Sequence, residues 1–261
     1  KTILSPINDH MKNVDLVIKN SLDSEIPIIN KISSHIINSG GKKLRPALHL
    51  LVAGWLGKIN KKNYQLAAIL EFIHTATLLH DDVVDEANSR RGFVSINKIW
   101  RNKAGVLLGD FLLAKGLQIA LKHKEYRMLE IQSEAVQLMS EGELRQLKTA
   151  GLFNMTEARY FQIISEKTAS LISTCCEVGA VSATDDESHQ KLMREIGMCV
   201  GIAFQIRDDL FDYGVYDIGK PTRNDIQERK VTLPLIKAFE HSDKRESTKI
   251  RALMKKRKKR T

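Results

Sequence analysis

Few residues in this sequence interrupt helices. Five prolines occur among 261 residues, and none lies between Pro46 and Pro221. Because proline lacks a backbone N–H donor and ends or kinks a helix, this interval can hold long helices. Runs of alternating apolar and polar residues bounded by turns, which are typical of strands, are nearly absent as well. These two shortages argue against the β-rich fold classes and predict an all-α fold.

The chain also lacks the signals of secreted and membrane proteins. No segment approaches the roughly 18 consecutive apolar residues of a membrane-spanning helix, and the first residues do not form a signal peptide. The three cysteines, Cys175, Cys176 and Cys199, show no Cys-x-x-Cys spacing, which favours buried thiols in a reducing compartment. We therefore expect a cytoplasmic protein without stable membrane insertion.

A basic patch interleaved with aromatic residues, typical of nucleic-acid binding, is missing too. The formal net charge is +10, but six basic residues form a single run from Lys255 to Arg260. A terminal basic run is most often solvated, and the chain contains no recognisable nucleic-acid module. Nucleic acid is therefore not an expected partner.

Apolar residues recur with helical periodicity over most of the chain. The predicted helices cover residues 10–25, 27–38, 46–56, 63–86, 96–122, 126–149, 156–182, 188–213, 231–240 and 243–257. Residues 40–46, 89–95 and 217–229 are expected to form turns or loops. No internal boundary or repeat interrupts this pattern, which predicts a bundle of long helices.

The pattern Asp-Asp-x-x-Asp occurs twice, at residues 81–85 and again at 208–212. Residues four apart share a helix face, so Asp81 projects with Asp85, and Asp208 projects with Asp212. Apolar residues flank both copies, which disfavours two merely solvated faces. Neighbouring carboxylates repel one another, so a cation is expected beside them. Two such faces opposed across a cavity would suit Mg²⁺, which takes carboxylates, waters and phosphate oxygens.

Basic residues cluster around both aspartate motifs. They are Lys42, Arg45, Arg90, Arg91, Lys167, Lys220 and Lys230. Arginine offers forked contacts to phosphate and lysine a compact charge. Each alone is weak evidence, since a surface cation is usually only solvated, but the grouping predicts a polyphosphate ligand. Gln205 lies one turn before Asp209, and His74 lies two turns before Asp81, although a lone histidine is more often a core residue.

Several motifs occur in a fixed order along the chain. They are Gly-Gly-Lys-x-x-Arg-Pro at 40–46, Glu-x-x-His at 71–74, His-Asp-Asp-x-x-Asp with Arg-Arg-Gly at 80–92, Gly-Asp at 109–110, Lys-Thr-Ala at 167–169, Phe-Gln-x-x-Asp-Asp-x-x-Asp at 204–212, Gly-Lys-Pro at 219–221 and Lys-Val-Thr-Leu-Pro at 230–234. Together they resemble the trans-isoprenyl diphosphate synthases, or polyprenyl synthetases. The resemblance implies a single domain over residues 1–261, a helical bundle around a central cavity. We expect this domain to lack C-terminal helices that relatives carry.

The resemblance implies an enzyme that condenses isopentenyl diphosphate with an allylic diphosphate and releases pyrophosphate. The reaction would proceed by ionisation, condensation and elimination, with pyrophosphate as the base. The cofactor would be Mg²⁺, about three ions per active site, and the assembly a homodimer. The best non-catalytic alternative is a partner subunit of a hetero-oligomeric synthase. That alternative is disfavoured because all six motif aspartates are present.

The family's roles carry over by position. Asp81, Asp85 and Asp208 would be the principal Mg²⁺ ligands, supported by Asp82, Asp209 and Asp212. The allylic diphosphate would contact Arg90, Lys167, Gln205, Lys220 and Lys230, with Thr168 assisting. Isopentenyl diphosphate would contact Lys42, Arg45, His74 and Arg91. The candidates for direct catalytic roles are Asp81, Asp82, Asp85, Lys167, Gln205 and Asp208.

Product length is expected to depend on residues upstream of the first aspartate motif. Ala76 and Thr77 lie five and four positions before Asp81, where a bulky aromatic tends to block elongation in the family. Their small side chains predict a medium- or long-chain product. Ala76 could equally be a packing residue where helices approach closely.

Two other enzyme classes share part of the pattern. A terpene cyclase would share the fold and the first motif, but the second would normally be an Asn/Ser/Glu metal motif, which is missing. His80-Asp81 also resembles the start of an HD-type phosphohydrolase site. That class needs further spaced histidines and leaves the second aspartate motif unexplained.

Overall fold

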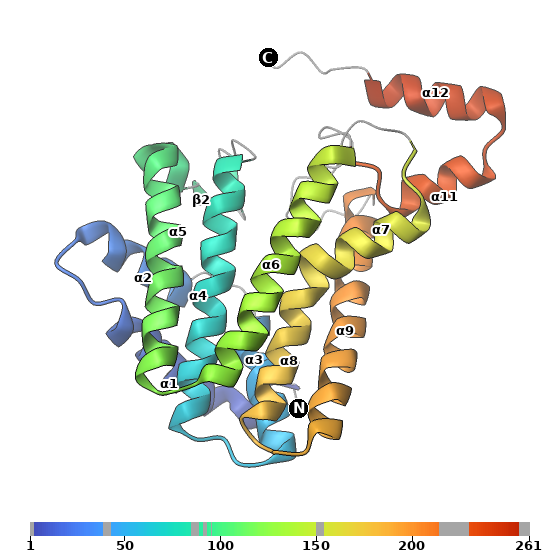
Figure 1. Cartoon of the computed structure of the whole chain (residues 1–261). Helices are drawn as coiled ribbons and strands as arrows, with labels where there is room; N and C mark the ends of the chain where they lie inside the picture. The colour runs from blue at the N-terminus through green and yellow to red at the C-terminus, as the bar shows by residue number, and fades with distance from the viewer. Residues whose placement is uncertain are drawn as a thin grey trace. The chain divides into compact units, whose positions relative to one another are not determined.

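The computed structural model describes residues 3–38, 43–84, 89–90, 93–94, 96–149, 154–213 and 230–255, without the side chains of residues 89–102 and 254–255. Helices fill almost all of these ranges (Figure 1), so the predicted all-α fold is confirmed. In the segment predicted as a loop, β1 (Ser89–Arg90) and β2 (Phe93–Val94) pair as a short antiparallel hairpin.

The helices lie close to the predicted ranges. In the first half they are the 3₁₀ helix η1 (Ser5–Ile7), α1 (Asn8–Ser21), α2 (Pro27–Asn38), α3 (Leu44–Leu56), α4 (Lys61–Val84) and α5 (Ile96–Lys122). In the second half they are α6 (Tyr126–Thr149), α7 (Glu157–Ile164), the π-helical turn η2 (Ser165–Ala169), α8 (Ser170–Val181), α9 (Glu187–Tyr213), α11 (Leu233–His241) and α12 (Lys244–Lys255).

Helix α1 ends at Ser21, earlier than the predicted end at residue 25. The chain leaves the helix there because Asn30 closes the following turn. Its Oδ1 accepts a hydrogen bond from the Ser24 amide at 3.1 Å, and its Nδ2 donates to the Ser24 carbonyl at 2.6 Å. Side-chain groups that satisfy the backbone in this way compete with helix formation.

The chain divides into two compact units. Unit 1 comprises Lys1–Glu134 and Ile172–Gly197, and unit 2 comprises Ala135–Leu171 and Met198–Thr261. Each unit is described by itself below. The expectation of a single domain over residues 1–261 stays a prediction.

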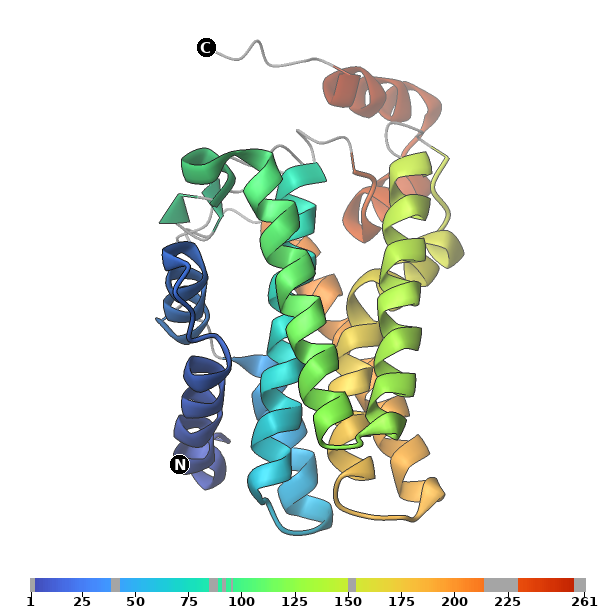
Figure 2. The same cartoon turned by 60° about the vertical axis from the view of Figure 1, so that its left-hand side comes forward.

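Helix α4 forms the centre of unit 1. Every residue from Leu66 to Ala76 is buried, so the helix is enclosed on all sides. Helix α5 runs alongside it in both views (Figures 1 and 2), and α1 and α3 also contact it. Burial of each large apolar side chain contributes about 1.5–3 kcal/mol. This packing holds the last turns of α4, which carry Asp81 and Asp82, in place.

The core of unit 2 brings the residues after position 230 against α7. Tyr160 and Ile164 of α7 pack with Val231, Leu235 and Ile236. Partly buried residues of α9, including Ile202 and Ile206, complete the cluster. The segment around Lys230 is therefore anchored beside α7 and α9.

One sequence expectation, that all three cysteines are buried, needs correction. Cys175 and Cys176 are buried as predicted, but Cys199 is exposed, because it lies on an outward face of α9. Among the described residues, one helical stretch, Lys103–Lys122, is long and apolar enough by length and composition to cross a membrane, and 33% of it is buried. The search for unbroken apolar runs missed it because charged residues interrupt the stretch. A core helix of a soluble protein passes the same test.

Candidate functional site

The first aspartate motif lies at the C-terminal end of α4 in unit 1. Asp81 is half-buried and Asp82 is buried, while Asp85 lies outside the described residues. Asp208 belongs to unit 2, so the expected opposition of the two motifs stays a prediction.

The imidazole of His80 is held against α5 beside this motif. Its Nε2 lies 3.3 Å from the Val106 carbonyl oxygen and 3.4 Å from Asp110 Oδ1. A Cβ atom at Gly109 would lie 2.2 Å from the same nitrogen. Glycine at position 109 therefore makes room for the histidine that precedes Asp81, which accounts for the Gly-Asp motif of α5.

Candidate residues for binding isopentenyl diphosphate and for setting product length also belong to unit 1. His74 is buried on α4, and Arg45 is half-buried in the first turn of α3. Ala76 is fully buried within the core cluster of unit 1. Thr77 is half-buried, and its Oγ1 donates to the His74 carbonyl at 2.9 Å.

Some candidate residues lie outside what the structure describes. Lys42, Asp85, Arg91 and Lys220 fall in undescribed segments, and only the backbone of Arg90, in β1, is described. Their roles stay predictions.

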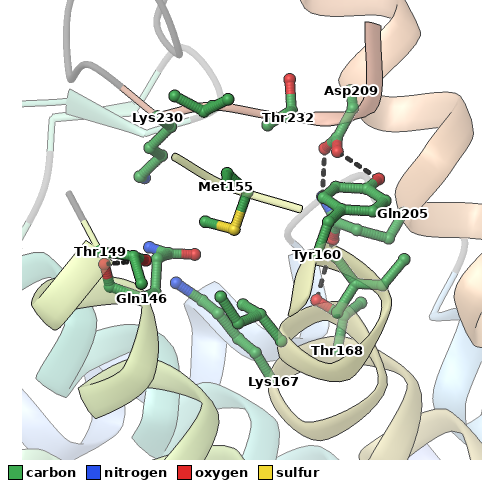
Figure 3. Close-up of a pocket in the computed structure, with 13 residues that line it drawn as sticks. Gln146, Thr149, Met155, Tyr160, Lys167, Thr168, Gln205, Asp209, Lys230 and Thr232 are labelled. Carbon is green, nitrogen blue, oxygen red and sulfur yellow. Dashed lines mark hydrogen bonds between the residues drawn. The ribbon is translucent and has the colours of Figure 1, made fainter. Parts of the chain in front are cut away.

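A cavity of about 130 Å³ occupies unit 2 beside the second aspartate motif (Figure 3). Five candidate residues meet there: Lys167, Thr168, Gln205, Asp209 and Lys230. The remaining lining residues are Gln146, Thr149, Met155, Tyr160, Ile163, Ile164, Val231 and Thr232. Residues far apart in the sequence thus converge on one cavity, while the roles expected for them stay predictions.

A chain of three hydrogen bonds runs along one wall of the cavity (Figure 3). The Tyr160 hydroxyl donates to Asp209 Oδ2 at 2.6 Å, and Gln205 Nε2 donates to Asp209 Oδ1 at 2.6 Å. The Thr168 hydroxyl donates to Gln205 Oε1 at 2.9 Å. Both oxygens of the Asp209 carboxylate therefore accept hydrogen bonds from protein side chains.

The surroundings of Asp209 oppose its ionisation. Burial raises the pKa of the Asp209 carboxyl, and the negative charges of Asp208 and Asp212 raise it further. The hydrogen bonds from Tyr160 and Gln205 lower the same pKa and so partly offset these effects. The second motif thus concentrates negative charge that a nearby cation would stabilise.

The donor set fits Mg²⁺. Among the described residues, no group of three or more His, Cys, Asp or Glu side chains could hold a metal ion by itself. Mg²⁺ does not need such a site, because it usually takes one or two carboxylates, several waters and phosphate oxygens. Asp208 and Asp212, four residues apart on α9, offer such a pair.

Helix α6 forms ion pairs with two residues of η2 beside the cavity. Lys167 forms an ion pair with Glu143, and Arg145 Nε lies 2.9 Å from Glu166 Oε2. Figure 3 shows the amino group of Lys167 on the side of the cavity where Gln146 lies. The ammonium group of Lys167 and the carboxyl group of Asp209 thus lie on different sides of the cavity.

The predicted helix over residues 156–182 is interrupted by η2, which carries Lys167 and Thr168. Two glycines let the neighbouring helices approach this turn. A Cβ atom at Gly142 of α6 would lie 2.7 Å from the Lys167 backbone nitrogen, and one at Gly201 of α9 would lie 2.5 Å from Ala169 Cα. Single π turns of this kind are frequent at functional sites.

We predict that Gly142→Ala displaces η2, because the contact is with backbone that cannot rotate away. The expected results are a loss of about 1–3 kcal/mol of unfolding free energy and a clear drop in turnover. Urea unfolding and a prenyltransfer assay measure these two effects. Gly54→Ala is the matched control, since its new methyl would meet only the end of the Ile59 side chain, at 3.1 Å. Wild-type turnover in Gly142→Ala would contradict the prediction.

Sequence reasoning missed Tyr160, which binds Asp209 from α7. It also missed Gln146, Thr149 and Met155 in the cavity lining. No local pattern marks these residues as functional, because Tyr160, Gln146 and Thr149 resemble ordinary packing positions on their helices and Met155 lies in the irregular segment before α7. Thr232 belongs to the Lys-Val-Thr-Leu-Pro motif at residues 230–234, which assigns it no role of its own.

The family model for polyprenyl synthetases matches residues 26–261. The octaprenyl diphosphate synthase of Escherichia coli K12 is 37% identical over 243 residues, which cover 92% of this chain and 75% of that protein. A crystal structure of a decaprenyl diphosphate synthase from Rhodobacter capsulatus matches with a TM-score of 0.88 and 39% identity, over 96% of this chain and 83% of that one.

A second solved structure is that of a polyprenyl synthase from Caulobacter crescentus CB15, complexed with calcium and isoprenyl diphosphate. It matches with a TM-score of 0.85 and 36% identity, over 96% of this chain and 82% of that one. These likenesses confirm the predicted isoprenoid synthase fold and the predicted enzyme class. The chain therefore belongs to the polyprenyl synthetase family, as a prenyl-transferring enzyme of the medium- or long-chain type.

Proposed function

We propose that this enzyme condenses isopentenyl diphosphate with an allylic diphosphate, head to tail and with trans geometry. The product is a medium- or long-chain polyprenyl diphosphate, and pyrophosphate is released. The observation that carries this proposal is the cavity of unit 2, where Lys167, Lys230 and the Thr168–Gln205–Asp209 hydrogen bonds surround one space. Its chemistry suits an anionic diphosphate joined to a group that becomes cationic.

Magnesium, about three ions per active site, would be held by Asp81, Asp85 and Asp208, with Asp82 and Asp212 in support. When bound, it supplies positive charge that stabilises the departing diphosphate. Arg90, Lys167, Lys220 and Lys230 bind the oxygens of the same diphosphate. Lys42, Arg45, His74 and Arg91 bind isopentenyl diphosphate, which carries the attacking double bond.

The chain's own residues then guide three changes of bonding. The C1–O bond of the allylic substrate breaks, and its electron pair leaves with the diphosphate that Lys167 and Lys230 contact. The double bond of isopentenyl diphosphate attacks the allylic cation and forms the new carbon–carbon bond. A proton is finally lost to the departing pyrophosphate. The oxygens of Thr168 and Gln205 stabilise the intermediate cation, while Met155, Ile163 and Ile164 limit access of water.

Product length is proposed to depend on Ala76 and Thr77. We predict that Thr77→Phe shifts products to shorter chains, because an aromatic ring from this half-buried position would block the path of the growing chain. Ala76→Phe is expected to act in the same direction but to cost about 1–3 kcal/mol of stability, since Ala76 is fully buried. Reversed-phase chromatography of the dephosphorylated products measures the shift. An unchanged product distribution in both variants would overturn this role.

A cytoplasmic homodimer without stable membrane insertion is proposed for the assembled enzyme. Helix α5 exposes Val106, Leu107, Leu117 and Leu121 in the single chain. A second copy could cover this apolar surface, since contiguous exposed apolar patches often mark interfaces.

The function is tested by incubating the purified protein with Mg²⁺, isopentenyl diphosphate and allylic starters of several lengths. Formation of products longer than farnesyl diphosphate, together with release of pyrophosphate, supports the proposal. A folded protein that elongates no starter would refute it. A product that stops at farnesyl diphosphate would refute the chain-length part alone.

A further inference from the structure

We propose that Tyr160 and Asp209 are positioning residues that fix the orientation of the Gln205 side-chain amide. In that orientation the carbonyl oxygen of Gln205 faces Thr168, and its amino group is turned toward Asp209. This inference rests on the proposed function, because it assigns how the wall of that cavity is kept in its active form. Neither residue need touch substrate for this role.

The orientation follows from what each group can donate. Both oxygens of Asp209 accept hydrogen bonds, Oδ2 from the Tyr160 hydroxyl and Oδ1 from Gln205 at 2.6 Å, so the Gln205 atom that faces Asp209 is the amide nitrogen. The amide oxygen is then left to accept from the Thr168 hydroxyl at 2.9 Å. A flipped amide would place two acceptor oxygens 2.6 Å apart in a buried site, which is strongly unfavourable.

Tyr160 makes this arrangement unique. Asp209 is 5% exposed and Tyr160 is 3% exposed, so little water can replace the hydroxyl that donates to Asp209 Oδ2. Without this hydroxyl, Oδ2 loses its buried donor, and the carboxyl group is free to rotate toward Gln205. After such a rotation Asp209 no longer holds the amide of Gln205 in one orientation.

The phenol of Tyr160 is itself held by packing. Its ring contacts Phe161 edge to face, with centroids 5.5 Å apart, and it belongs to the core cluster of Val231, Leu235 and Ile236. The hydrogen bonds of Tyr160, Asp209, Gln205 and Thr168 therefore connect α7, and the segment that leads into α11, to the cavity wall formed by α9 and η2. A rigid donor is what a buried carboxylate needs to keep a single orientation.

The orientation matters for the rate of reaction. A carbonyl oxygen beside Thr168 stabilises positive charge that develops on an allylic group, whereas an amino group there destabilises it. The effect appears as charge develops and is small in the ground state. Loss of the hydrogen bond from Tyr160 to Asp209 is therefore expected to lower kcat and to leave KM nearly unchanged.

The first test compares Tyr160→Phe with Tyr64→Phe. Both remove one hydroxyl, but the Tyr64 hydroxyl bonds His10 Nδ1 at 2.8 Å in unit 1 and does not line the cavity. We expect kcat to fall about tenfold in Tyr160→Phe, with KM for each substrate within about twofold of wild type. Tyr64→Phe is expected to keep the wild-type kcat. A wild-type kcat in Tyr160→Phe, or a loss confined to KM, would overturn the inference.

The second test exchanges donor and acceptor. Gln205→Glu places a second carboxylate against Asp209 and is expected to lower kcat more than Tyr160→Phe does. Adding Asp209→Asn to Gln205→Glu supplies an amide that can donate to the new carboxylate while its oxygen still accepts from Tyr160. All three hydrogen bonds are then possible again, with an oxygen facing Thr168. We expect the kcat of the double variant to be at least about fivefold higher than that of Gln205→Glu. An equal kcat in the two variants would overturn the inference.

A third test separates positioning from metal binding. Asp208→Asn is expected to weaken binding of Mg²⁺ with inorganic pyrophosphate, measured by calorimetry, by at least about tenfold. Asp209→Asn is expected to leave that affinity within about threefold while kcat falls. If Asp209→Asn weakens Mg²⁺ binding as much as Asp208→Asn does, Asp209 is a metal ligand and the inference is wrong.

The wild-type assay distinguishes this inference from the function on which it rests. A wild type that elongates no starter refutes the proposed function. A wild type that elongates normally, together with an equally fast Tyr160→Phe, refutes the positioning role alone. Thermal melting of each variant shows whether it folds, and the exchange of donor and acceptor decides the question if Tyr160→Phe unfolds.

Discussion

Asp81→Asn is expected to lower kcat by about a thousandfold, while the helical circular dichroism spectrum stays that of wild type. Asparagine keeps the size of the side chain but removes the charge that would hold Mg²⁺ at the end of α4. Removal of one preorganised electrostatic group typically costs about 10²–10³ in rate, and here the metal would be weakened as well. The half-saturating Mg²⁺ concentration is therefore expected to rise together with the loss of kcat.

Asp23→Asn is the matched control for this substitution. Asp23 is exposed in the turn between α1 and α2, away from both aspartate motifs in the sequence. Its replacement removes the same charge and is expected to leave kcat and the Mg²⁺ requirement unchanged. Wild-type turnover in Asp81→Asn would refute the proposed metal role of the first motif.

The free energy of unfolding is expected to fall steeply as the pH drops below 6.5, because of His49 on α3. This residue is fully buried, and neither ring nitrogen has a hydrogen-bond partner of normal geometry among the described residues. Burial lowers the pKa of His49 from 6.5 to about 3, and the Asn63 backbone opposes this shift. The folded state therefore holds the imidazole neutral, while the unfolded state binds a proton below pH 6.5.

The sign follows from this difference in protonation. Between pH 6.5 and about 3 the unfolded state binds one more proton, so stability is lost as the pH falls. The expected slope is about 1.4 kcal/mol per pH unit. Above pH 6.5 both states are neutral at this site, and its contribution no longer changes.

Guanidinium unfolding of wild type and His49→Leu at several pH values isolates the contribution of His49 to the pH dependence of the unfolding free energy. Titrating carboxyl groups contribute to both proteins and cancel in the difference. His241→Gln, at the exposed end of α11, serves as the control and is expected to keep the wild-type slope. A difference between wild type and His49→Leu that does not vary with pH would contradict the prediction.

The helices could be predicted from the sequence because their signals are local. Predicted and observed ranges agree for residues 27–38, 96–122 and 126–149. The departures have physical causes that lie outside the helix pattern. Asn30 reaches back to close the turn after α1, and Gly142 and Gly201 allow close packing around η2. Helical periodicity contains neither signal.

The candidate site was predicted in its parts. Lys167, Thr168, Gln205, Asp209 and Lys230 could be selected from motifs, and the structure brings them to one cavity. The role of Asp209 could not be read from its motif. Its position in the motif implies support of the metal, which stays a prediction, and the structure adds its hydrogen bonds with Tyr160 and Gln205.

The sequence by itself determined the all-α fold, the family and the residues that bring charge to the site, because periodicity and motif spacing are properties of short segments. Only the tertiary structure decided that Tyr160, 49 positions from Asp209, donates to it, and that Thr168, 37 positions from Gln205, donates to its amide oxygen. It also decided that His49 is fully buried. Such pairings depend on which helix faces meet, and that is set by the packing of the whole unit rather than by any local pattern.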